Sequence, residues 1–206
     1  MTTARDLFLT AMDSGSSSTE PVGQGDLSLA LAGAELIDLI GTGAAGVEDD
    51  RIVPRGSQSL DDRLLGEAAA GLTPQAPYER IEDWLWRRGR DLSAAYQTAL
   101  EEDGDLTRER RGRLSLGAER VEAADTPARR RAEDRWRDRE PVLAALAAAV
   151  GVSDERSLDT DEEPGLDDGA AATVVAAVHD AVMELEAVRQ RRSIENAAYA
   201  NLWRGP

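Results

Sequence analysis

Several residue types that support common chemistries are missing from this chain of 206 residues. It has no cysteine, which excludes disulfides, thiolate metal sites and cysteine nucleophiles. It also has no lysine, so a glycine-rich phosphate loop that ends in lysine is excluded and all 24 basic residues are arginine. Aromatic residues make up only 4% of the chain, and the core must therefore consist mainly of Leu, Ala, Val and Ile.

Long apolar segments are missing as well. No stretch approaches about 18 uninterrupted apolar residues, and the chain does not open with a basic segment followed by an apolar run. We therefore expect a cytoplasmic protein. A net charge of −16 argues against nucleic acid as a partner and against adsorption to an anionic membrane by the overall field. A local basic site remains compatible with this charge, because the Debye length is about 8 Å at physiological salt.

Residues for catalysis and metal binding are scarce. His179 is the only histidine, and no nucleophile or orienting acid is singled out near it, so we expect a structural, partly buried side chain. The carboxylate groups lack the spacing of a calcium-binding loop. The sequence therefore predicts no catalytic residue, no metal ligand and no cofactor, which favours a non-enzymatic protein.

The most informative segment runs from Asp26 to Pro54. It begins with a helix whose only polar residues after Asp26 are Ser28, Glu35 and Asp38, which share an arc of about 80°. So narrow a polar stripe predicts a central helix that is buried against several neighbours. The glycines after Ile40 end this helix, and residues 44–53 are typical of a small β-hairpin around an acidic turn.

The rest of the chain predicts more helices and a second hairpin. We expect helices at 1–12, 59–70 with Ser59 as N-cap, 78–89, 91–103 with Asp91 as N-cap, 126–139 with Thr126 as N-cap, 141–150, 167–191 and 193–203. Leu106–Val121 predicts the second hairpin, with its turn at Arg111-Gly112. Residues 13–25 and 153–166 are expected to be mobile loops. The predicted fold is mainly α: one helical domain over residues 1–206, with two small winged-helix-like hairpins.

The cluster with the clearest binding chemistry lies in the helix at 78–89. Guanidinium groups bind phosphate oxygens in a bidentate manner, and tryptophan is suited to a membrane interface. The candidate lipid- or anion-binding residues are Trp84, Trp86, Arg87, Arg88 and Arg90. The competing interpretation is that Trp84 belongs to the core and the arginines are C-terminal charges that suit the helix dipole. A second arginine run, at 129–139, is interrupted by acids and is typical of a solvated helix face.

Four segments, in order and spacing, resemble the bacterial form of the Golgi phosphoprotein 3 family. They are 6–13 (DLFLTAMD), the central helix with its hairpin at 26–53, 81–90 (IEDWLWRRGR) and 100–121. The resemblance covers nearly the whole chain. It implies a mainly helical domain, phosphatidylinositol 4-phosphate binding at a membrane, an adaptor role toward membrane enzymes, and molecular association through the second hairpin.

The residues that form the lipid pocket in eukaryotic relatives are not present in this chain. Their positions fall near Gly23, at Ala32, and around Leu166 and Gly169, within acidic surroundings. We therefore expect a peripheral membrane adaptor that binds an anionic lipid headgroup through the Trp84–Arg90 cluster, at the inner face of the plasma membrane. The alternative is a cytoplasmic protein-interaction or regulatory module that does not bind lipid.

Overall fold

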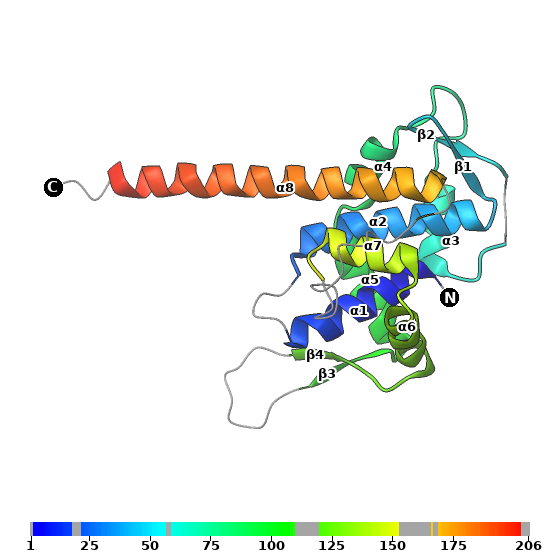
Figure 1. Ribbon diagram of the computed structural model, residues 1–206, viewed down its shortest axis with the longest axis horizontal. Helices are drawn as coiled ribbons and strands as arrows, with labels where there is room; N and C mark the ends of the chain where they lie inside the picture. Colours follow the sequence, from blue (N-terminus) through cyan, green and yellow to red (C-terminus); the bar gives the residue numbers. More distant parts are fainter. Residues whose placement is uncertain are drawn as a thin grey trace.

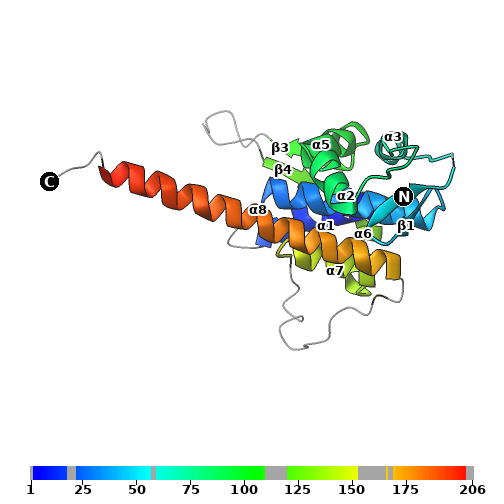
Figure 2. The same cartoon turned by 90° about the horizontal axis from the view of Figure 1, so that it is seen from above.

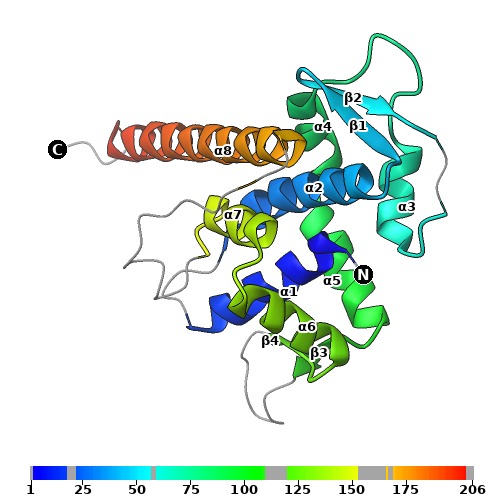
Figure 3. The ribbon, with the colours of Figure 1, turned by 45° about the vertical axis from the view of Figure 1, so that its right-hand side comes forward.

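The computed structural model describes residues 2–17, 22–56, 59–109, 120–152, 166 and 169–202. The prediction of a mainly helical fold is confirmed, with helices packed around a central one and two short antiparallel hairpins at the periphery (Figure 1). Figure 3 shows the two hairpins at opposite ends of this helical body. Buried side chains from all eight helices of the described chain and from both hairpins contribute to one hydrophobic cluster.

The central element is α2 (Gln24–Gly41), as the sequence predicts. Most of its apolar side chains are buried, and α2 contacts α1, α3, α4, α5, α7, α8 and β1. The contact with α8 is tight at Gly33, where a Cβ placed on this residue would lie only 2.3 Å from a methyl group of Val178. A side chain at position 33 would therefore push the two helices apart.

The polar stripe of α2 is bound by several neighbours. Ser28 accepts a hydrogen bond from the Ser93 amide at 3.0 Å, and Asp38 accepts one from the Ala4 amide at 3.4 Å. Glu35, which is fully buried, is bound by side chains of α4 (Ile81–Arg88) and α5 (Leu92–Glu102). Each polar residue of the stripe thus has a partner outside α2.

Both predicted hairpins are present. β1 (Ala45–Glu48) pairs with β2 (Arg51–Pro54) around the acidic turn, where Asp49 adopts a positive φ of 56°. β3 (Leu106–Glu109) pairs with β4 (Arg120–Ala123). The predicted turn at Arg111-Gly112 lies outside the described residues.

Two predictions near the N-terminus are wrong. The first helix, α1 (Thr3–Ser17), continues well past Met12 into the segment predicted as a loop, and α2 already begins at Gln24. Polar residues such as Asp13 suggest a loop, but Asp13 pairs with Arg129 at 3.1 Å, a contact across the fold that the sequence does not reveal. The remainder of the predicted loop, 18–21, lies outside the described residues.

The middle helices differ from prediction mainly at their first residues. α3 (Arg63–Ala70) is capped by Asp62, whose side chain accepts a hydrogen bond from the Leu65 amide at 2.9 Å, and not by Ser59. α4 begins at Ile81, so the predicted start at 78 is three residues early. Asp91 occupies the N-cap position of α5 but has a left-handed backbone and makes no capping hydrogen bond.

The next two helices begin at prolines. Thr126 caps α6 (Pro127–Arg137) as predicted, by accepting a hydrogen bond from the Arg129 amide. This helix ends two residues before the predicted Arg139, which has a positive φ of 52°. The predicted helix at 141–150 is confirmed as α7 (Pro141–Ala149).

The last element is one continuous helix, α8 (Gly169–Leu202), and the predicted break near residue 192 is absent. Its first half packs on α2, α4 and α7 through Val174, Val178 and Ala181. Its second half projects beyond the body, as Figure 1 and, from above, Figure 2 show. Of the loop predicted at 153–166, only Leu166 lies within the described residues.

Candidate functional site at the end of α4

The predicted binding cluster lies on α4 and the two residues that follow it. Glu82 and Asp83 are in the first turn of this helix and Arg87 and Arg88 in its last, an order of charges that suits the helix dipole. Gly89 ends the helix, as the sequence predicts. The five candidate residues differ in exposure: Trp84 is buried, Arg88 is partly buried, and the other three are exposed. The structure therefore does not bring all of them to one surface.

Trp84 lies in the core. Its side chain is fully buried, and its indole N–H donates a hydrogen bond to the Ala32 carbonyl of α2 at 3.2 Å. A buried tryptophan needs such an acceptor, because its one polar group would otherwise be desolvated without compensation. Trp84 therefore anchors α4 to the central helix and is not available to an external ligand.

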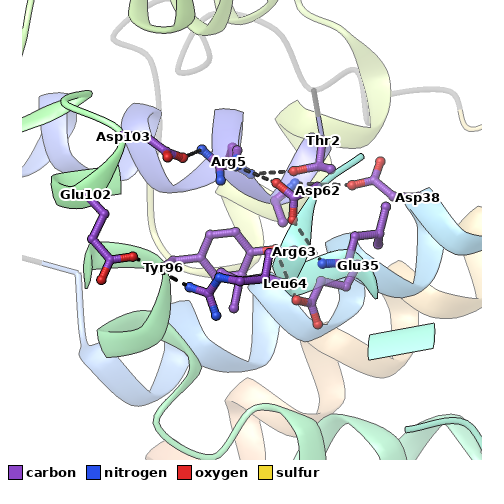
Figure 4. Close-up of polar contacts among 12 residues, drawn as sticks. Thr2, Arg5, Glu35, Asp38, Asp62, Arg63, Leu64, Tyr96, Glu102 and Asp103 are labelled. Carbon is purple, nitrogen blue, oxygen red and sulfur yellow. Dashed lines mark hydrogen bonds and ion pairs between the residues drawn. The ribbon is translucent and has the colours of Figure 1, made fainter. Parts of the chain in front are cut away.

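Arg88 points into the body. Its guanidinium binds the Glu35 carboxylate through two hydrogen bonds, from Nε at 2.7 Å and from Nη2 at 2.8 Å, and also donates to the Leu64 carbonyl at 3.0 Å. The hydroxyl of Tyr96, another buried side chain, donates to the same carboxylate at 3.0 Å, and Figure 4 shows Tyr96 directed toward Glu35. Arg88 is thus an internal counter-ion for a buried acid.

The charge of Glu35 depends on this network. Burial raises the pKa of the Glu35 carboxyl, while the hydrogen bonds and positive charge of Arg88 act in the opposite direction. Burial also raises the pKa of the Tyr96 hydroxyl, and the neighbouring Glu35 charge adds to that effect. Tyr96 therefore remains a hydrogen-bond donor to Glu35 at physiological pH.

Arg87 has a partly exposed side chain with its own acidic partner. It makes two hydrogen bonds of 2.7 Å to the carboxylate of Glu79 and one of 3.0 Å to the Gly71 carbonyl. Its guanidinium carbon also lies 5.1 Å from the centroid of the Trp84 ring, which is cation–π distance. The positive charge of Arg87 is therefore balanced within the fold.

Two of the candidate residues remain on the surface. Trp86 is 36% exposed, one of three large hydrophobic side chains in the described chain with this much exposure. Arg90 is also exposed and has no ion-pair partner among the described residues. We call Trp86, Arg87 and Arg90 the α4-end surface. It combines one aromatic ring, one neutralised arginine and one arginine that is free to bind.

Other charged groups that the sequence singles out are arranged differently. On α6, Arg137 pairs with Asp134 at the surface, as expected for a solvated face with interleaved charges. Arg135 departs from that expectation, because it points inward and pairs with the buried Asp6 of α1. His179 is exposed on α8, so the expectation of a partly buried histidine is wrong. Within the described ranges, no three histidine or acidic side chains meet in a way that would hold a metal ion.

The carboxylates beside Tyr96 form a group that the sequence does not reveal. Figure 4 shows Arg5 between Asp62 and Asp103, with an ion-pair distance of 2.6 Å to each. The nearby Asp38, on α2, directs its side chain toward the first residues of α1. Burial raises the pKa of this carboxyl to about 6. In the sequence, Glu35 and Asp38 stand out as acidic residues on an otherwise apolar helix. This pattern indicates that they have partners but does not identify them.

The model of one protein family, described as Golgi phosphoprotein 3 (GPP34), matches residues 4–190 of this chain. The chain belongs to this family. None of the curated proteins searched matches it. In this GPP34 protein, Ala32 is fully buried on α2 and Gly169 begins α8, so neither position presents a group that pairs with phosphate. Across the described residues, no helix has the length and apolar composition needed to cross a membrane.

Proposed function

We propose that this GPP34 protein is a non-enzymatic adaptor that visits the inner face of the plasma membrane through the α4-end surface. The observation that carries this proposal is that Trp86 and Arg90 are both exposed, four residues apart, and that Arg90 has no ion-pair partner among the described residues. An indole ring suits the interface between lipid headgroups and acyl chains. A free guanidinium suits a phosphate.

Such a contact is weak and depends on salt. One arginine near an anionic surface contributes about 1 kcal/mol, and the net charge of −16 opposes approach at low ionic strength. Arg87 adds little, because Glu79 already neutralises it. Stable residence at a membrane therefore needs a second contact, and a membrane enzyme held as cargo would supply it in an adaptor of this family.

The alternative function is a protein-interaction or regulatory module that does not bind lipid. The pairing of Arg88 with Glu35 and of Arg87 with Glu79 favours it, because two of the three arginines in the cluster are committed to internal carboxylates. Both candidate functions involve a protein partner. They differ in whether the α4-end surface contacts an anionic lipid.

Co-sedimentation with liposomes tests the proposal. The vesicles contain phosphatidylcholine alone or with phosphatidylinositol 4-phosphate or cardiolipin, at low and at physiological salt. Arg90→Ala and Trp86→Ala should each reduce the bound fraction on anionic vesicles. Arg130→Ala is the matched control, since it removes the same charge from an exposed position on α6. Equal binding by Arg90→Ala and Arg130→Ala, or no binding by the wild type, would leave the protein-interaction module as the function.

A further inference from the structure

The second half of α8 has no support from the body. Residues 190–196 are all exposed, and the last contact to the body that the described residues show is the ion pair between Arg189 and Asp26, at 2.6 Å. An isolated helix of about 12–15 residues is only marginally stable in water. The helix nevertheless continues to Leu202, which points to a partner along this half.

The outward face of α8 has the repeat of a helix–helix seam. The residues at heptad spacing on this face are all exposed, and four of the six are apolar: Ala176, Asp180, Met183, Ala187, Gln190 and Ile194. Met183 and Ile194 are 57% and 70% exposed, the largest values among the exposed large hydrophobic side chains of the described chain. The face that packs on the body lies on the opposite side of the helix, so both faces can be occupied together.

The charges beside this seam are self-complementary. Glu184 and Arg191 flank the seam on the same side, seven residues apart, in equivalent positions of successive heptads. In an antiparallel pair of helices, residues at this heptad position face each other across the seam, so Glu184 of each copy lies opposite Arg191 of the other. The same register places Met183 against Ile194 and Ala187 against Gln190, twice each by symmetry.

We propose that the outward face of α8, from Met183 to Ile194, binds a second copy of this chain as an antiparallel helix pair. The unsupported half of each α8 then lies along the supported half of its partner. A parallel pair would place the two unsupported halves only against each other. The proposal is independent of the lipid contact, and it uses a surface other than the β3–β4 hairpin.

Cysteine cross-linking tests the register directly, because the natural chain has no cysteine to give a background. Met183→Cys and Ile194→Cys change exposed side chains that do not pack in the core. Upon oxidation, a mixture of the two variants should form a disulfide-linked dimer, and each variant alone should not. Efficient linkage of Met183→Cys to itself would indicate a parallel pair and would overturn the proposal, as would the absence of linkage in the mixture.

Sedimentation equilibrium then tests the charge complementarity. The wild type should be in monomer–dimer equilibrium, and Arg191→Glu should raise the dissociation constant about tenfold or more, because it turns two attractive contacts into repulsive ones. Adding Glu184→Arg to that variant should restore the wild-type value. The matched control, Arg130→Glu on α6, should leave the equilibrium unchanged. A monomeric wild type, or equal dissociation constants for all variants, would exclude this interface.

Discussion

Arg88 and Glu35 are 53 residues apart in the chain and form a doubly hydrogen-bonded ion pair inside the body. Glu35 is fully buried and the Arg88 side chain is 17% exposed, so solvent screens the pair only weakly. This contact, with the indole hydrogen bond from Trp84 to α2, fixes α4 against the central helix. It also explains why Arg88, whose guanidinium group is chemically suited to bind phosphate, is not available to an external anion.

Removing Arg88 should strongly destabilise the protein. We expect Arg88→Ala to lower the free energy of unfolding by about 3–5 kcal/mol, because the buried Glu35 carboxylate would lose its counter-ion. Replacing both partners, as Glu35→Leu with Arg88→Met, should cost less than Arg88→Ala alone. Urea denaturation measures all three. Arg137→Ala, which breaks an exposed pair with Asp134, is the control and should cost under about 1 kcal/mol.

Stability should depend on pH through Asp38. Burial raises the pKa of this carboxyl from 3.8 to about 6, so the folded protein binds a proton that the unfolded chain releases between these values. The contribution of Asp38 to the free energy of unfolding is therefore fully present below the unfolded pKa. As the pH rises toward 6, the free energy of unfolding falls by about 1–3 kcal/mol. Burial raises the pKa of Asp6 and Glu35 in the same direction.

Denaturation curves collected across this range test that dependence. Asp38→Asn retains an oxygen that can accept the Ala4 hydrogen bond but does not titrate, so its stability should vary less with pH between about 4 and 6. Asp61→Asn, at an exposed position, should keep the wild-type dependence. If Asp38→Asn has the same slope as the wild type, burial of Asp38 does not contribute to the pH dependence.

Adding a methyl group at Gly33 should be costly, because a side chain of α8 already occupies the space that it would need. The new Cβ would lie 2.3 Å from a methyl of Val178, and we expect Gly33→Ala to lower the unfolding free energy by about 1–3 kcal/mol. Val178→Ala in the same chain should recover part of the loss. Gly66→Ala is the control within α3, where no atom lies within 4 Å, and should stabilise by about 0.5–1 kcal/mol.

The cap of α6 should contribute a smaller amount. Thr126→Ala removes the acceptor for the Arg129 amide and should lower the melting temperature, at a cost of about 1 kcal/mol. Thr126→Asp restores an acceptor and should retain most of the wild-type stability. Thr98 lies at an exposed position in the middle of α5, and its hydroxyl donates a hydrogen bond to the Ala94 carbonyl of the preceding turn. Thr98→Ala should therefore be neutral or slightly stabilising. Equal losses at both threonines would contradict a capping role.

Elements with strong local signals could be predicted from the sequence. The apolar repeat of α2, the acidic turn of the first hairpin and the Thr126-Pro127 start of α6 are local patterns, and each is present in the structure. The length of α1 and the unbroken α8 were missed, because distant contacts and continuous helical propensity outweigh polar composition there.

The candidate site was harder to predict because its interactions join distant segments. Sequence spacing placed Arg87, Arg88 and Arg90 together. It could not show that Arg87 pairs with Glu79 or that Arg88 pairs, across the core, with Glu35. Which of three neighbouring arginines points inward depends on the packing angle of α4, and Trp84 sets that angle. The exposed pair of Trp86 and Arg90 could therefore be recognised only in the fold.

The three residues of the polar stripe on α2, Ser28, Glu35 and Asp38, also restrict how the helices can align. If α2 slid by one turn, about 5.4 Å, Ser28, Glu35 and Asp38 would all move away from their partners on α5, α4 and α1. Leaving a buried polar group such as Ser28 or Glu35 without a partner would cost about 1–3 kcal/mol, whereas leucine and alanine side chains would still find apolar surroundings. The polar stripe thus selects one helix register among several that would bury apolar side chains equally well.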